Sequence, residues 1–190
     1  NAHTHIIDQA NQAYTLRASL IDHANVSIDA QYYIWHNDTT GKQLLHKLQQ
    51  AAERGVRVRL LLDDNNTNGM DNILTALNAH PNIQIRLFNP FLIRKWRALG
   101  YLADFPRVNR RMHNKTLTAD NRASIIGGRN IGDEYLTDSA QKTTFADMDV
   151  LVSGSIVTRI SQEFDRYWRS DSAYPLETII KPTARRIAQG

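Results

Sequence analysis

A histidine, a lysine two residues later and an aspartate five residues after that form the pattern H-x-K-x-x-x-x-D at His113, Lys115 and Asp120. Alternate residues of a strand point to the same side, so a strand here places the imidazole of His113 beside the ammonium of Lys115. An imidazole is an available nucleophile toward phosphorus near neutral pH, and an adjacent ammonium can hold phosphate oxygens as their charge develops. The pair indicates phosphodiester chemistry that needs no metal.

Two glycines and an asparagine follow this motif, at Gly127, Gly128 and Asn130. Glycines allow backbone N–H groups to approach a phosphate closely, and the Asn130 amide can donate to another oxygen. A buried core histidine and a solvated lysine would explain His113 or Lys115 taken singly. The glycines and the basic residues nearby favour a phosphate site for the whole set.

A basic and aromatic stretch precedes the motif and is a candidate for contact with lipid or another anion, through Arg94, Lys95, Trp96, Arg97, Arg110 and Arg111. Cations interleaved with apolar and aromatic side chains suit a membrane interface or a nucleic-acid backbone. A solvated loop over the edge of the core is the alternative that remains open.

The elements around these residues predict an α/β fold, with a mixed, largely parallel β-sheet and helices on both of its faces. A strand at 26–35, a helix from Thr39 that stops at Gly55, and an apolar strand at 56–62 form a βαβ unit with parallel strands. Further expected elements are helices at 6–24, 71–79 and 161–169, strands at 83–88 and 150–152, and a hairpin of 115–119 with 123–126. In the first of these helices, Arg17 falls on the side predicted to face solvent.

Length and composition limit the number of domains and the classes of partner and site that the chain can have. The 190 residues suit one domain, predicted at 1–170, with 171–190 as a linker or the start of a second half. A net charge of +4 suits an anionic partner, and the absence of cysteine excludes disulfides and thiolate zinc sites. No apolar run is long enough to span a membrane. Because the chain begins at Asn1 without a leader, we expect an excised or processed piece.

Two weaker patterns resemble metal sites, but we expect no metal and no cofactor. The segment Asp64-x-Asn66-x-Asn68-Gly69 begins like a calcium loop, yet Thr75 stands where the bidentate glutamate belongs. His3 and His5 lack further ligands and lie near the start of the chain.

The H-x-K-x-x-x-x-D motif with its glycines and Asn130 resembles the signature of the phospholipase D superfamily. Within that superfamily, four segments are similar to the bacterial cardiolipin synthases, especially the type C kind: 31–35 (QYYIW), 54–64 (RGVRVRLLLDD), 110–115 (RRMHNK) and 127–135 (GGRNIGDEY). The resemblance extends from about Ile6 to Trp168.

This resemblance implies a two-step exchange through a phosphohistidine. His113 is then the nucleophile or the acid/base, while Lys115 and Asn130 grip the phosphate. Asp120 is structural more than catalytic in the family. A carboxylate that orients the histidine is expected further along, at Asp147, with Asp149 as the second choice.

Family members of this kind carry two such motifs in one active site, whereas this chain carries one. The second histidine is expected from a missing C-terminal half or from another copy of the chain. The implied partners are a phosphatidylglycerol-like phospholipid and an anionic membrane surface, at the cytoplasmic face of a bacterial inner membrane. Two alternatives stay open: a homodimeric phosphodiesterase or nuclease, and a catalytically inert module that binds phosphate or lipid.

Overall fold

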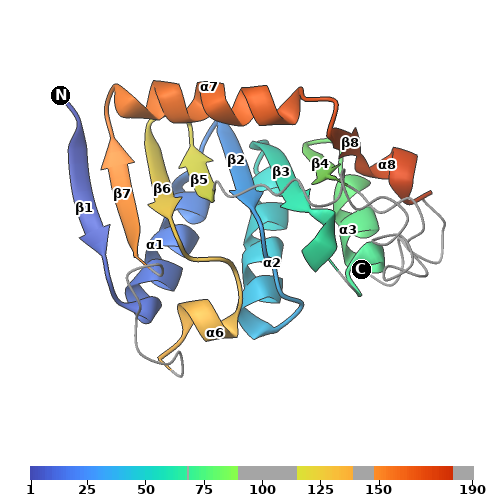
Figure 1. Ribbon diagram of the computed structural model, residues 1–190, viewed down its shortest axis with the longest axis horizontal. Coiled ribbons are helices and arrows are strands. Elements are labelled where there is room, and N and C mark those ends of the chain that lie inside the picture. The colour runs from blue at the N-terminus through green and yellow to red at the C-terminus, as the bar shows by residue number, and fades with distance from the viewer. Residues whose placement is uncertain (68, 90–114, 139–147, 182–190) are drawn as a thin grey trace.

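The computed structural model describes residues 1–67, 69–89, 115–138 and 148–181 (Figure 1). Its centre is an eight-stranded sheet in the order β1-β7-β6-β5-β2-β3-β4-β8. The strands are β1 His3–Ile7, β2 Ser27–Tyr32, β3 Arg57–Asp63, β4 Ile83–Phe88, β5 Thr116–Ala119, β6 Ala123–Gly127, β7 Asp149–Ser153 and β8 Ala173–Pro175.

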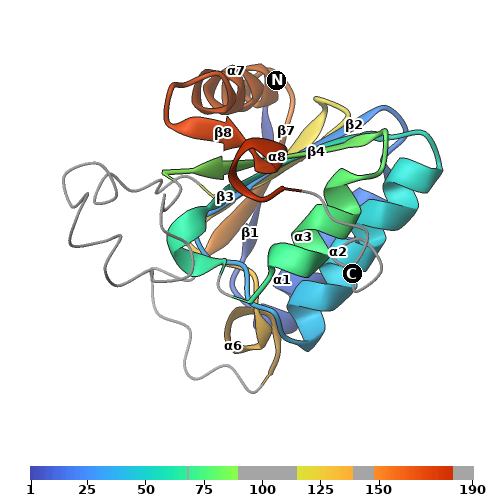
Figure 2. The same cartoon turned by 90° about the vertical axis from the view of Figure 1, so that its right-hand side faces the viewer.

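Helices cover both faces of this sheet, as the sequence predicted. The helices are α1 Ala10–His23, α2 Thr39–Glu53, α3 Asp71–Asn78, α6 Asp133–Leu136, α7 Ile156–Trp168 and α8 Leu176–Ile179, with a 3-10 turn at Asp64–Asn66. Figure 2 shows α7 on the opposite side of the sheet from α1, α2 and α3. The α/β class is therefore confirmed.

The expectation of a largely parallel sheet was wrong. Only the pairs β2–β3 and β3–β4 are parallel among the described strands, and these are the pairs joined through α2 and α3. The strands β1, β5, β6, β7 and β8 make antiparallel pairs. The tight turn between β5 and β6 produces one of them, because Asp120 and Asn121 both have positive φ, at 56° and 54°, as a two-residue hairpin requires.

The main core lies on the side of α1, α2 and α3, and a smaller cluster lies under α7. The smaller cluster consists of Leu61, Phe88, Phe164, Trp168 and Ala173. The helix α7 begins five residues before the predicted helix at 161–169, and its buried residues are Val157, Phe164 and Trp168.

The segment at 171–181, predicted as a linker or the start of a second half, contains β8 and α8. The strand β8 pairs antiparallel with β4, and Ala173, Leu176 and Ile180 are buried. Residues up to Ile180 therefore contribute to the packed fold. Within the described ranges, no helix combines the length and apolarity needed to cross a bilayer.

Candidate active site

Lys115 lies beside Gly127 and Gly128, because the start of β5 is next to the end of β6 (Figure 1). It directly precedes β5, and its Nζ donates a hydrogen bond of 3.0 Å to the carbonyl oxygen of Gly128. The N–H of Gly127 donates to the carbonyl of Lys115 at 3.3 Å. The structure thus brings the motif lysine and both glycines together.

Asn130 lies in the loop from β6 to α6, where its side chain bonds to the end of β2. The backbone N–H of Ile34 donates to Oδ1 of Asn130 at 3.0 Å, which assigns the orientation of the amide. Ile131 forms a parallel bridge with Trp35, so the loop is held along the extension of β2. With Oδ1 engaged, the NH2 group of Asn130 is the part of the amide that can donate to a phosphate.

Gly127 occupies a position that accepts no side chain. Its φ is +156°, and a Cβ there would lie 2.4 Å from the carbonyl oxygen of Met148 and 2.7 Å from Cα of Asp149. Because both obstructing groups belong to the backbone of the β7 side, neither can rotate away. The close approach of the two strands explains why a glycine is required here.

Asp120 stands apart from these groups, at the opposite end of β5. Five residues at about 3.3 Å each separate it from Lys115 by about 16 Å along the strand. Its carboxylate accepts hydrogen bonds from the backbone N–H groups of Asn25, Val26 and Ser27. Burial opposes its charge, yet these three donors hold the pKa of Asp120 below its ordinary value. The structure does not bring Asp120 to Lys115.

Asp149, the second choice for the carboxylate that orients the histidine, is bound inside the protein. One of its oxygens lies 2.9 Å from the Arg17 guanidinium, and the backbone N–H of Arg129 donates to the other at 3.3 Å. Asp149 is 0% exposed and Arg17 is 1% exposed. Burial opposes the charge of Arg17, but Tyr32 and Asp149 raise the pKa of the guanidinium above its ordinary value. The prediction that Arg17 faces solvent was wrong.

The remaining predicted site residues lie outside the described residues. They are His113, Asp147 and the six residues of the basic stretch, Arg94, Lys95, Trp96, Arg97, Arg110 and Arg111.

Two further groups were not anticipated near residues 128–132, the loop between β6 and α6 that we call the glycine loop. The buried guanidinium of Arg129 donates to the carbonyls of Tyr135 and Asp8, at 2.9 Å each, and so ties the loop to α6 and to the start of α1. The imidazole of His36 lies 2.8 Å from Glu134 and stacks on the ring of Tyr135. The only signal in the sequence for Arg129 is its place between Gly128 and Asn130. His36 carries no such signal, because its partner Glu134 lies 98 positions away.

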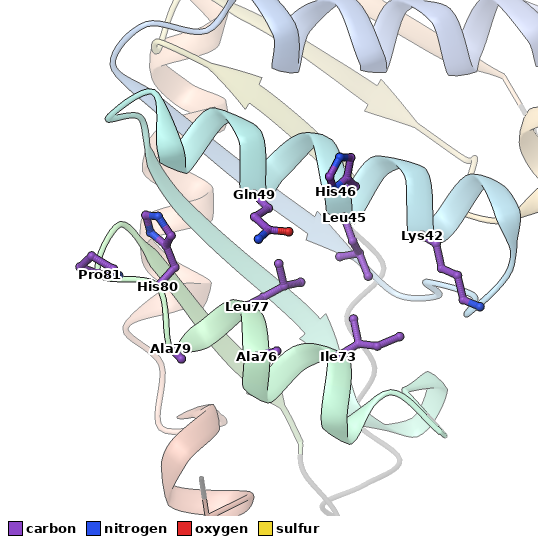
Figure 3. A pocket seen from close by; sticks show the side chains of 10 residues that line it. All are labelled: Lys42, Leu45, His46, Gln49, Ile73, Ala76, Leu77, Ala79, His80 and Pro81. Atoms are coloured by element: carbon purple, nitrogen blue, oxygen red, sulfur yellow. The ribbon is translucent and has the colours of Figure 1, made fainter. Parts of the chain in front are cut away.

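Two cavities were compared with the positions of the predicted site residues. One of about 460 Å³ includes Lys115 and Gly127 in its lining. A larger one, of about 730 Å³, lies between α2 and α3 and is lined by Lys42, His46 and His80 above apolar residues such as Ile73 and Leu77 (Figure 3). The larger cavity includes no described motif residue, so its size does not make it the site. Within the described ranges, no cluster of three histidine or acidic side chains is arranged to hold a metal ion.

Comparison with known proteins identifies relatives over most of the chain. The family model for the PLD-like domain of cardiolipin synthase matches residues 18–168. Cardiolipin synthase C of Escherichia coli strain K12 is 47% identical over 174 residues, which are 92% of this chain and 37% of that protein. An uncharacterized protein of Helicobacter pylori strain 26695 is 40% identical in an alignment of 192 positions that covers 97% of this chain and 38% of that protein. The chain thus spans little more than a third of these relatives.

Solved structures with the same fold have low sequence identity. Phosphatidylserine synthase from Haemophilus influenzae gives a TM-score of 0.69 at 13% identity, covering 98% of this chain and 41% of that one. Nuc, a phospholipase D family member from Salmonella typhimurium, gives 0.60 at 18% identity, covering 92% of this chain and 98% of that one. At such identities the likeness shows the fold alone.

Proposed function

The chain belongs to the family of cardiolipin synthase PLD-like domains, and we propose that it supplies one half of the active site of a phosphatidyl transferase that forms cardiolipin. The observation that carries this proposal is the contact of Lys115 with Gly128 beside Asn130, in a chain that matches the family over residues 18–168. A cation, backbone N–H groups and an amide donor at one place are suited to bind a phosphodiester.

The proposed reaction has two steps. An imidazole nitrogen of His113 attacks the phosphorus of a phosphatidylglycerol-like lipid, the bond from phosphorus to the leaving alcohol oxygen breaks, and that oxygen takes a proton from an acid of the partner half. The hydroxyl of a second phospholipid then gives its proton to the conjugate base of that acid and attacks phosphorus. This attack breaks the P–N bond and restores the imidazole. Lys115 and the NH2 group of Asn130 stabilise the charge on the non-bridging oxygens.

For the carboxylate that orients the imidazole of His113, we favour Asp147 over Asp149. A carboxylate in this role accepts a hydrogen bond from the second ring nitrogen of the histidine. Asp149 is buried against Arg17 and Arg129, which engage both of its oxygens. Its charge is therefore already balanced within the fold.

The other half of the site belongs, in this proposal, to a second H-x-K-x-x-x-x-D element. The chain covers 37% of the Escherichia coli relative, so a longer natural protein leaves ample length for it, and a second copy of the chain is the alternative source. The basic stretch at 94–97 together with Arg110 and Arg111 is proposed to contact anionic lipid, at the cytoplasmic face of the inner membrane.

The test uses the natural gene product that contains these residues, incubated with dihexanoyl phosphatidylglycerol. Lipid products are followed by mass spectrometry for the wild type, His113→Ala and Lys115→Met. We expect cardiolipin from the wild type, a loss of about 10³-fold or more with His113→Ala, and a loss of about 10²-fold with Lys115→Met. Lys47→Met, which removes a lysine bonded to Asp22 on the helical surface, is the matched control.

Three outcomes contradict the proposal. Cardiolipin formation that persists undiminished in His113→Ala would place the chemistry elsewhere. Cleavage of single-stranded DNA without any lipid product would support the nuclease alternative. Binding of phosphatidylglycerol with no turnover of lipid or DNA would support the inert module.

A further inference from the structure

The cavity of about 460 Å³ lies between α7 and the sheet, beside Lys115. We call it the α7 groove and define it by Gln31, Thr116, Ile126, Ile156, Ile160 and Phe164. Lys115 and Gly127 also line it, so it is continuous with the proposed phosphate site. Its volume falls within the range of about 300–1,000 Å³ typical of small-molecule sites.

The floor of the α7 groove is a row of side chains from three neighbouring strands. Gln31 of β2 is directly opposite Thr116 of β5, and Thr116 is directly opposite Ile126 of β6. Residues paired in this way share one face of a sheet. On the other side of β2, Leu61 of β3 is paired with Gln31 and packs with Phe164 of α7, so this is the face that α7 covers.

Two polar side-chain atoms on this floor are buried. Gln31 is 1% exposed, and neither its Nε2 nor the Oγ1 of Thr116 has a hydrogen-bond partner within the described part of the chain. Folded proteins satisfy nearly all of their buried polar groups, because a buried donor without an acceptor is costly. An amide and a hydroxyl together indicate a ligand that brings an acceptor oxygen to this place.

The remaining lining determines what surrounds that oxygen. Ile126, Ile156, Ile160 and Phe164 form an apolar wall, which a purely polar ligand would leave uncovered. Among the described lining residues, the charged ones are Lys115, Arg159 and Glu163, and the carboxylate of Glu163 accepts hydrogen bonds from Arg166. The ligand that fits is an amphiphile with a negative group, an acceptor oxygen and an alkyl chain.

We propose that the α7 groove binds the acyl-ester part of the phospholipid whose phosphate Lys115 holds. The ester carbonyl accepts hydrogen bonds from Nε2 of Gln31 and Oγ1 of Thr116, and the alkyl chain lies against Ile160 and Phe164. Because Lys115 and Thr116 both line this cavity, one lipid can reach both groups. This inference rests on the proposed function and names the part of the substrate that the groove selects.

Binding without turnover tests this proposal most directly. Calorimetry compares dihexanoyl phosphatidylglycerol with glycerophosphoglycerol, which has the same headgroup but no acyl chains, on the natural gene product. We expect the acylated lipid to bind at least about tenfold more tightly, and Ile160→Trp, which fills the groove, to abolish that preference. Ile73→Trp, which fills the cavity between α2 and α3 instead, is the matched control and should retain the preference (Figure 3).

The polar floor is tested separately by Gln31→Leu and Thr116→Val. Each exchange should weaken binding of dihexanoyl phosphatidylglycerol about three- to tenfold, since each removes one donor to the ester. Gln31→Leu should also unfold at the same temperature as the wild type or higher, because it removes a buried donor that has no hydrogen-bond partner among the described residues. A lower unfolding temperature would mean that Gln31 has a structural role instead.

Equal binding of the two ligands by the wild type overturns the groove proposal, and so does a preference that survives Ile160→Trp. Neither result depends on catalysis. The ratio of kcat/KM for dihexanoyl phosphatidylglycerol to that for bis(p-nitrophenyl) phosphate, a diester without acyl chains, separates the two proposals further. If Ile160→Trp leaves this ratio unchanged, the groove proposal fails while the transferase proposal stands. If the wild type neither hydrolyses nor transfers either diester, the transferase proposal fails. The binding preference for the acylated lipid then still tests whether the α7 groove binds the acyl ester.

Discussion

The carboxylate of Asp149 and the guanidinium of Arg17 are in contact at 2.9 Å inside the protein, from a strand and a helix that are far apart in the sequence. The guanidinium of another buried arginine, Arg129, lies 3.6 Å from the same carboxylate oxygen. The hydroxyl of Tyr32 accepts a hydrogen bond of 3.2 Å from Arg17. This cluster links α1 and β7 to the glycine loop, so it supports the position of the proposed phosphate site.

We predict that Asp149→Asn lowers the free energy of unfolding by about 3–5 kcal/mol, because two buried guanidinium groups lose their counter-charge. Urea denaturation followed by circular dichroism measures the change. Asp22→Asn is the control, since Asp22 pairs with Lys47 at the surface and its loss should cost about 1 kcal/mol or less. Equal effects of the two variants would show that the buried cluster contributes no more than a surface pair.

Asp120 yields a prediction about pH. Asp120→Asn retains a residue that tolerates the left-handed backbone of the β5–β6 turn but removes the charge that the N–H groups of Asn25, Val26 and Ser27 stabilise. We expect a loss of about 1–2 kcal/mol near pH 7, at the low end for charged hydrogen bonds because solvent screens a partly exposed carboxylate.

The sign of the pH dependence follows from the direction of the shift. The pKa of Asp120 is lowered in the folded state, so its contribution is complete above the ordinary value of 3.8 and is lost as the pH falls through the folded value. Thermal unfolding of wild type and Asp120→Asn should therefore differ most near neutral pH and converge in strong acid. A difference that grows toward low pH would contradict this assignment.

The sequence predicted those parts of the fold that depend on local patterns. The apolar strand at Ile83–Phe88 and the helix that ends before Gly55 both follow from periodicity and a stop signal. The strand β1 was missed because four of its five residues are exposed, so no alternation marks it. The burial of Arg17 was missed for a different reason: its partner Asp149 is contributed by β7, and only the assembled sheet brings the two together.

The same holds for the candidate site. The motif predicted Lys115, Gly128 and Asn130 as a group. The bond from Ile34 to Asn130 and the bond from Arg129 to Asp149 could be found only in the structure.

A third prediction concerns the close approach at Gly127. Gly127→Ala forces a Cβ to within 2.4 Å of a backbone oxygen, so β6 and β7 must separate where the glycine loop begins. Gly55→Ala is the matched control, because Gly55 has a φ of +93° but no atom within 4 Å of the added Cβ. We expect the control to cost about 1 kcal/mol through backbone strain alone, and Gly127→Ala to cost at least about 2 kcal/mol. Chemical denaturation of both variants checks this order, and a smaller loss for Gly127→Ala would refute it.

The fourth prediction concerns the attachment of α7, which forms one wall of the α7 groove. Arg59 of β3 donates two hydrogen bonds to Asp29, at 2.8 and 2.9 Å, and a third to Asp165 of α7 at 2.8 Å. Its guanidinium also lies 4.9 Å from the ring centre of Phe164. A planar group with several donors can make these contacts at once, whereas an ammonium cannot.

Arg59→Lys should therefore lower the free energy of unfolding by about 1–3 kcal/mol, although it conserves the charge. Because α7 forms a wall of the α7 groove, the same variant should also accelerate amide hydrogen exchange in α7 more than in α2, which packs on the other face. Arg169→Lys is the control, since Arg169 reaches Asp165 only at 3.7 Å and is largely exposed, and its exchange pattern should match the wild type. Uniform acceleration across both helices would mean that Arg59 stabilises the fold as a whole rather than the docking of α7.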